Sequence, residues 1–145
     1  MSGREIIPYD LMLEKARGAN ILWAPLLRRI VAWAGPAPVI SVSPPPPIAD
    51  FTPFYAKVKE KADVSGFQPD SVRAKLWRVQ VIAEREHAKA LGAEFLDSPR
   101  EAETEPGLLR AEYANDHLHG NVRFGRLLAR AIQETLSRRH VRTEF

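Results

Sequence analysis

The sequence has no cysteine among its 145 residues, which excludes a disulfide framework, a thiolate nucleophile and a cysteine-ligated metal site. Long hydrophobic runs are missing as well. The longest uncharged stretch, residues 30–49, is interrupted by Gly35 and repeated prolines, so it cannot form a membrane-spanning helix. The first ten residues mix charges of both signs and lack the apolar segment of a signal peptide. We expect no membrane span, and the compartment stays open with the cytoplasm as the default.

A strong excess of charge of one sign is also absent, because the net charge is only +3. Basic residues within 138–142 are offset by glutamates within 101–105. A nucleic-acid-binding surface usually concentrates Lys and Arg on one face, with aromatic or motif support. The basic tail instead fits the C-terminal end of a helix, where cations suit the helix dipole. We therefore expect no nucleic-acid partner.

Common catalytic and cofactor motifs are lacking. The sequence has no G-x-S-x-G, G-x-x-x-x-G-K-[ST], G-x-G-x-x-G or H-E-x-x-H, and we expect no cofactor. Glu84 and His87 form an E-x-x-H pair, but di-iron helical bundles need a second such pair and further glutamates on facing helices. The sequence has no second pair. A solvated helix face explains Glu84 and His87 better than a metal site.

What the sequence does contain is an alternation of helical and strand patterns. Residues 20–35 predict a helix that ends at Gly35 and tolerates Pro25 in its first turn. One side of this helix is apolar and comprises Leu22, Leu26, Ile30 and Trp33. Residues 38–43 are rich in β-branched side chains and bounded by prolines, which is typical of a short buried strand. The proline-rich segment 44–54 cannot continue either element and predicts a loop.

The alternation then repeats. Residues 72–91 predict a helix with Ser71 as its N-cap and Gly92 at its C-terminal end. Residues 93–98 predict a second strand, and residues 99–108 predict a polar, acidic loop that could contact a substrate. Residues 121–139 predict the last helix. Its expected apolar face comprises Gly125, Leu128, Ala129, Ile132 and Leu136.

This order of elements predicts an α/β fold, in which parallel strands are joined by crossover helices. Two strands, or three if residues 5–9 form one, are few for such a sheet, which usually has five or six. The chain therefore reads like the second half of a larger domain. Because an unpaired parallel edge rarely stays exposed, we expect homo-oligomerisation or domain swapping through the open sheet edge.

The segment 113–125 (YANDHLHGNVRFG) contains two of the four histidines beside an aspartate. His117 and His119 form an H-x-H, which can place two imidazoles on a metal if further ligands converge on it. Asp116 and His119 form a D-x-x-H, in which the carboxylate can hold the imidazole with Nε2 free, as in the base half of a serine triad. Alternatively, Asp116 or Asn121 caps the following helix and the histidines are bystanders. Spacing alone favours the cap, because D-x-x-H is common by chance.

Residues 114–132 resemble the C-terminal block of SGNH (GDSL-type) hydrolases. In that block a D-x-x-H precedes a polar residue and the last helix, and an aromatic residue beside a glycine follows, here Phe124 and Gly125. Residues 38–51 resemble the family's late core strand and its proline-rich turn. Residues 81–98 resemble its next helix and strand. The resemblance covers residues 21–136 with the segments in the family's order.

The resemblance implies a partial three-layer α/β/α sandwich, SGNH or flavodoxin-like, with a short parallel sheet whose N-terminal strands are missing. It implies an esterase, lipase or deacetylase acting on small acyl esters, with Asp116 as the orienter and His119 as the general base. His117 has no assigned role. The family's Gly-Asp-Ser nucleophile and Gly-x-Asn-Asp block are absent from the sequence. We therefore expect residues 1–145, taken as one domain, to supply the Asp–His half of a triad.

A second hypothesis is a non-catalytic α/β interaction module. Such a module would keep the second half of the fold and bury its open sheet edge against a partner or a second copy.

Overall fold

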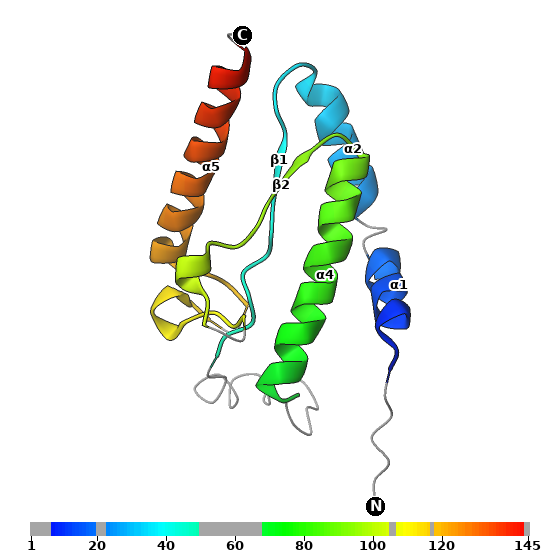
Figure 1. Cartoon of the computed structure of the whole chain (residues 1–145), viewed down its shortest axis with the longest axis vertical. Helices are drawn as coiled ribbons and strands as arrows, with labels where there is room; N and C mark the ends of the chain where they lie inside the picture. The colour runs from blue at the N-terminus through cyan, green and yellow to red at the C-terminus, as the bar shows by residue number, and fades with distance from the viewer. Residues whose placement is uncertain (1–6, 20–22, 50–67, 105–106, 117, 144–145) are drawn as a thin grey trace, which may run out of the picture. The chain divides into compact units, whose positions relative to one another are not determined.

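The computed structural model describes residues 7–19, 23–49, 68–104, 107–116 and 118–143 (Figure 1). Its elements are α1 (Tyr9–Ala19), α2 (Trp23–Ala34), β1 (Ile40–Val42), α4 (Asp70–Ala90), β2 (Glu94–Leu96), the short 3₁₀ helices η2 (Arg100–Ala102) and η3 (Ala111–Tyr113), and α5 (Val122–Thr143). β1 and β2 form a parallel pair. The described chain is thus a mixed α/β structure, and the predicted order of helix, strand, helix, strand, helix is confirmed from α2 onward.

Helix α1 is the element that the sequence analysis missed. The optional strand at residues 5–9 is wrong in its described part, because Ile7 and Pro8 lie outside any strand and Tyr9 begins the helix. The Pro8 carbonyl accepts the amide N–H of Met12 at 3.2 Å. Asp10 in the first turn of α1 suits the positive end of the helix dipole. Pro8 and Asp10 in the sequence therefore indicate the start of a helix.

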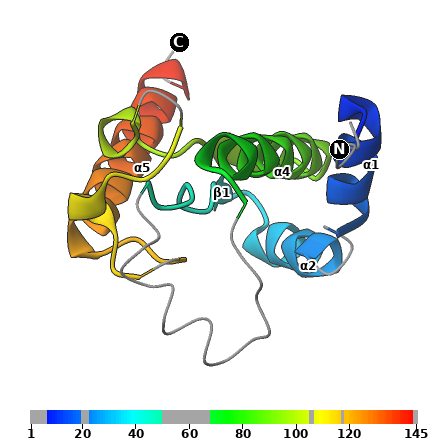
Figure 2. The ribbon, with the colours of Figure 1, turned by 90° about the horizontal axis from the view of Figure 1, so that it is seen from below.

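The chain folds as two compact units. The first contains residues 1–41 and 76–95, and the second contains residues 42–75 and 96–145. In the first unit, Leu13 of α1 packs with Val79 and Ala83 of α4, and both ribbon views show these two helices side by side (Figure 2). The Arg17 guanidinium binds both carboxylate oxygens of Glu86, at 2.9 and 3.1 Å. This pair fastens the same two helices at their surface.

Helix α4 starts two residues before the predicted position. The helix begins at Asp70, and the amide N–H groups of Val72 and Arg73 both donate to the Pro69 carbonyl, at 2.9 and 3.0 Å. Ser71 therefore lies inside the first turn. Its predicted role as N-cap is wrong, because the residue in the N-cap position is Pro69, two residues earlier, whose carbonyl accepts the first bonds of the helix.

Glycines end two of the helices, as predicted. Gly35 follows α2 with φ +56°, and Gly92 follows α4 with φ +80°. At the end of α4, Gly92 N–H donates to the Lys89 carbonyl at 3.1 Å and Ala93 N–H donates to the Ala88 carbonyl at 2.9 Å. These two bonds make a Schellman motif, in which a left-handed residue satisfies the last free carbonyls of the helix.

Both strands are shorter than the predicted segments 38–43 and 93–98. Glu94 N–H donates to the Val39 carbonyl at 2.9 Å, and Ser43 N–H donates to the Leu96 carbonyl at 2.8 Å. Within the second unit the chain makes one more parallel bridge, between Ile48 and Leu109. This bridge holds the proline-rich segment after β1, as far as residue 49, against Leu109. Leu109 lies a few residues before the turn that contains Asp116 and His119.

The core of the second unit includes residues expected in a polar loop or at its border. Leu109 is 1% exposed and Ala102 fully buried, and both pack with Phe124 of α5. The segment 99–108 is therefore more than a solvated loop, because η2 lies within it and Glu103 pairs with Leu109 in an antiparallel bridge. The glutamates of this segment had suggested a polar loop, although Ala102, Leu108 and Leu109 are buried.

The apolar face predicted for α5 is only partly correct. Leu128 and Ile132 are half-buried, whereas Gly125, Ala129 and Leu136 are exposed. The side chains of α5 that are actually buried or half-buried are Phe124, Leu127, Leu128, Ala131, Ile132 and Thr135. The buried face is therefore rotated toward Phe124, which is the residue that anchors the start of the helix.

Candidate active site

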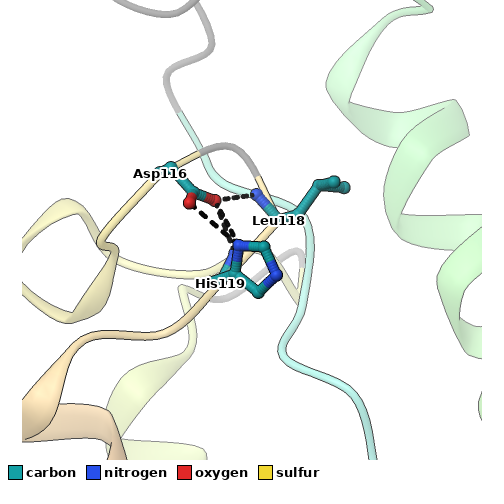
Figure 3. Close-up of polar contacts among 3 residues, drawn as sticks. All are labelled: Asp116, Leu118 and His119. Carbon is teal, nitrogen blue, oxygen red and sulfur yellow. Dashed lines mark hydrogen bonds and ion pairs between the residues drawn. The ribbon is translucent and has the colours of Figure 1, made fainter.

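The candidate site is a tight turn immediately before α5. Ala114 and Gly120 form an antiparallel bridge. Inside that bridge, Asn115 N–H donates to the His119 carbonyl at 2.9 Å, and beside it Asn121 N–H donates to the Tyr113 carbonyl at 2.8 Å. The backbone is thus closed on itself at both ends of the turn. This closure fixes the positions from which Asp116 and His119 project (Figure 3).

Asp116 is the centre of the hydrogen bonds within the turn. Its Oδ1 accepts the backbone N–H groups of Leu118 at 2.8 Å and His119 at 2.9 Å. The ring Nδ1 of His119 lies 2.9 Å from Oδ1 and 2.8 Å from Oδ2 of the same carboxylate. The Leu118 N–H, together with the ring and backbone N–H of His119, holds the pKa of Asp116 far below the usual value of an aspartate.

The carboxylate of Asp116 selects one tautomer of His119. An ionised carboxylate can only accept hydrogen bonds, so the proton must lie on Nδ1 of the imidazole. In the neutral ring, Nε2 then carries a free lone pair and can take a proton from another group. The His119 side chain is 71% exposed, and Figure 3 shows Nε2 on the side of the ring away from Asp116. The arrangement is therefore an imidazole held by a carboxylate, with its second nitrogen accessible from solvent.

Asn121, rather than Asp116, caps α5. Its Oδ1 accepts the backbone N–H groups of Arg123 at 2.9 Å and Phe124 at 3.3 Å, which are among the first free donors of the helix. Its Nδ2 donates to the carbonyls of Glu112 at 2.8 Å and Ala114 at 3.2 Å. The capping alternative for Asn121 is confirmed, and it leaves the Asp116 carboxylate to the turn and to His119.

Gly120 is a site residue that the sequence analysis missed. A Cβ atom on Gly120 would lie 2.6 Å from Cγ of Phe124 and 2.9 Å from its Cβ. Phe124 is 4% exposed and belongs to the core of the second unit. The glycine next to His119 therefore lets the turn rest directly on the core. The i, i+4 spacing of Gly120 and Phe124 across a helix start was the only signal in the sequence.

No nucleophile is paired with His119 in the described part of the chain. Ser43 and Ser98 follow β1 and β2, and both are buried, at 3% and 6% exposure. The Ser43 hydroxyl donates to the Pro44 carbonyl at 3.0 Å, and Oγ of Ser98 has no partner among the described residues. The partners of the His119 ring there are the two oxygens of Asp116. The structure thus brings together Asp116 and His119, the pair predicted from the D-x-x-H spacing.

The other candidate ligands are not drawn together. His117 lies outside the described residues, so the H-x-H hypothesis stays a hypothesis. Within the described residues, no group of three or more His, Asp or Glu side chains has the arrangement of a metal site. Glu84 accepts a hydrogen bond from Gln80 at 2.8 Å, while Nε2 of His87 is buried with no partner in the described chain. Glu84 and His87 therefore have separate environments on α4.

Among the residues that the structure describes, no helix has the length and apolar character needed to cross a bilayer. Comparison with known proteins gave no match to a family model, to a curated sequence or to a solved structure.

Proposed function

We propose that Asp116 and His119 are the orienter and the general base of a serine acyl hydrolase of the SGNH (GDSL) type. The observation that supports this proposal is the contact of His119 Nδ1 with both oxygens of a carboxylate, at 2.8 and 2.9 Å. The same carboxylate also accepts the backbone N–H groups of Leu118 and His119, which fixes its position in the turn. Because Asn121 caps α5, capping of that helix does not account for Asp116.

In the proposed reaction a serine hydroxyl attacks the carbonyl carbon of a small acyl ester. Nε2 of His119 takes the hydroxyl proton as the new bond forms and returns it to the leaving alcohol as the ester bond breaks. Asp116 stabilises the imidazolium formed in between. Water then repeats the two steps and frees the acid. The serine and the donors for the oxyanion have to come from outside the described arrangement.

The finer fold proposal follows the same family. A partial three-layer sandwich would extend the parallel pair of β1 and β2 with further strands. Its support is the alternating order of α2, β1, α4, β2 and α5 and the position of the D-x-x-H turn directly before the last helix. Additional strands and their loops would also bury part of the His119 ring, which is largely exposed to solvent.

Two measurements test the proposal. In ¹⁵N-edited NMR spectra at neutral pH, His119 should be the Nδ1–H tautomer, and Asp116→Asn should shift the ring toward the Nε2–H form. Hydrolysis of p-nitrophenyl acetate should be slow in this chain and should fall further in His119→Ala, while the neighbouring variant His117→Ala keeps the wild-type rate. Equal rates for the wild type and His119→Ala would rule out the base role in this chain.

The second hypothesis, a non-catalytic interaction module, has an observation of its own. Of the twelve large exposed apolar side chains among the described residues, eight lie in the first unit, and four of these eight are on α2. Such side chains are typical of surfaces that meet a partner.

A further inference from the structure

Helix α2 has two apolar sides with the same spacing. The first side is half-buried and comprises Ala24, Leu27, Val31 and Ala34. The second side is exposed and comprises Trp23, Leu26, Ile30 and Trp33. Both follow steps of three, four and three residues, which is the a/d pattern of a helix seam. The second side, here called the open seam, is the more exposed of the two, although Trp23 at its start also lines a pocket with residues of α1 and α4.

The open seam is far more exposed than is normal for such side chains. Trp33 is 90% exposed and Trp23 is 66% exposed, while Leu26 and Ile30 are 45% and 41% exposed. Single exposed apolar residues are ordinary on protein surfaces, but an aligned row of large ones marks an interaction site. Tryptophan is also the residue type most enriched among those that dominate binding energy at interfaces.

We propose that the open seam is the contact between two copies of this chain, packed with their α2 helices antiparallel. In an antiparallel pair, an a position of one helix meets a d position of the other. The order Trp, Leu, Ile, Trp then matches itself, since Trp23 meets Trp33 of the other copy and Leu26 meets Ile30. A twofold contact of this kind is self-complementary and closes after two subunits. It lies on α2 and is separate from the sheet edge.

The exposed area fits a small, reversible dimer. With indole side chains of about 150–250 Å² each, the two tryptophans leave roughly 300 Å² per chain in water, and Leu26 and Ile30 add on the order of 100–150 Å². Two copies would then bury about 1,000 Å² with the flanking residues, which is the small end of specific interfaces. We therefore expect dissociation at micromolar concentrations.

Arg29 makes the orientation testable. It borders the open seam near the middle of α2, where the twofold axis of an antiparallel pair would pass, so two Arg29 side chains would lie on the same edge of the contact. Like charges in that position repel each other, and salt screens them. The dimer should therefore tighten as the ionic strength rises, and Arg29→Gln should tighten it at low salt. In a parallel pair, Arg29 would face Ala34 and neither effect would occur.

Sedimentation velocity over about 1–100 µM protein tests the contact itself. The wild type should pass from monomer to dimer. Ile30→Glu and Trp33→Glu should each raise the dissociation constant about tenfold or more. Ala32→Glu is the matched control, because it adds the same charge at an exposed position of α2 away from both seams. Its dissociation constant should stay within about threefold of the wild type.

A disulfide assay tests the antiparallel order without relying on these charged variants. Since the chain has no cysteine, a tagged Leu26→Cys chain can be mixed with an untagged Ile30→Cys chain and oxidised. The mixed disulfide should predominate over the two homodimers. A wild type that stays monomeric at the highest concentration overturns the proposal, whether or not it binds vesicles or other proteins. Equal loss of dimer in Ala32→Glu, or predominance of the homodimeric disulfides, overturns it as well.

Discussion

Replacing Gly120 by alanine tests whether the candidate turn depends on direct contact with the core. The added Cβ would lie 2.6 Å from Cγ of Phe124, well inside the normal separation of two carbons. Phe124 packs with Ala102 and Leu109, so its ring can move only by disturbing buried neighbours. Overpacking of this kind costs about 1–3 kcal/mol. Alanine also restricts the unfolded chain more than glycine does, which stabilises the folded state by about 0.4–1 kcal/mol. We therefore expect Gly120→Ala to lower the free energy of unfolding by about 1–2 kcal/mol.

The matched control is Gly125→Ala, one turn into α5. A Cβ at Gly125 would meet nothing within 4 Å, and alanine is favoured over glycine inside a helix by about 1 kcal/mol. Urea unfolding followed by circular dichroism should therefore show opposite signs, with Gly120→Ala less stable and Gly125→Ala more stable than the wild type. If Gly120→Ala matches or exceeds the wild-type stability, the close packing of the turn on Phe124 is not as described.

Three further predictions concern the polar groups. Asn121→Ala should lower the free energy of unfolding by about 1 kcal/mol or more, because it removes the cap of α5 and two donations to the preceding carbonyls; no loss in urea unfolding would contradict the cap. The hydrogen-bond donors around Asp116 lower its pKa in the folded protein. The ionised carboxylate should therefore stabilise the fold fully above the pKa of an unfolded aspartate. This stabilisation should be lost as the pH falls toward the lower pKa of the folded state. The carboxyl ¹³C shift of Asp116 should accordingly stay that of the ionised form in the range where ordinary aspartates titrate. Burial raises the pKa of Glu84, so its ionisation opposes folding as the pH rises, and Glu84→Gln should raise the melting temperature at neutral pH and lose that advantage in acid.

The local elements were predictable because their signals are local. The β-branched residues between prolines marked β1, and Gly92 marked the end of α4. The core of the second unit was not predictable in the same way, because Ala102 and Leu109 are buried by a bridge that forms within a segment rich in glutamate. The rotated face of α5 has a similar cause. Phe124 rather than Gly125 points inward, because Gly120 leaves room for the ring.

The site was half predictable for a chemical reason. A carboxylate three residues before a histidine in a turn can reach Nδ1 without help from the rest of the fold, so the Asp116–His119 pair could be anticipated from spacing and resemblance. Whether Asp116 or Asn121 caps α5 depends on side-chain directions that spacing does not encode. The open seam of α2 was only partly anticipated. Leu26, Ile30 and Trp33 were expected to form an apolar side, but their exposure becomes evident only once the rest of the first unit is in place.

The hydrogen bonds that shape the turn before α5 all join residues no more than nine positions apart in the sequence. Contacts between residues this close in the sequence cost little loop-closure entropy, so they form early in folding. The turn and its cap therefore behave as a cassette, in which the positions of Asp116 and His119 are inherited from thirteen consecutive residues, 112–124. A cassette of this kind can be transplanted as one segment onto another helix start, provided that the host offers a pocket for the Phe124 ring.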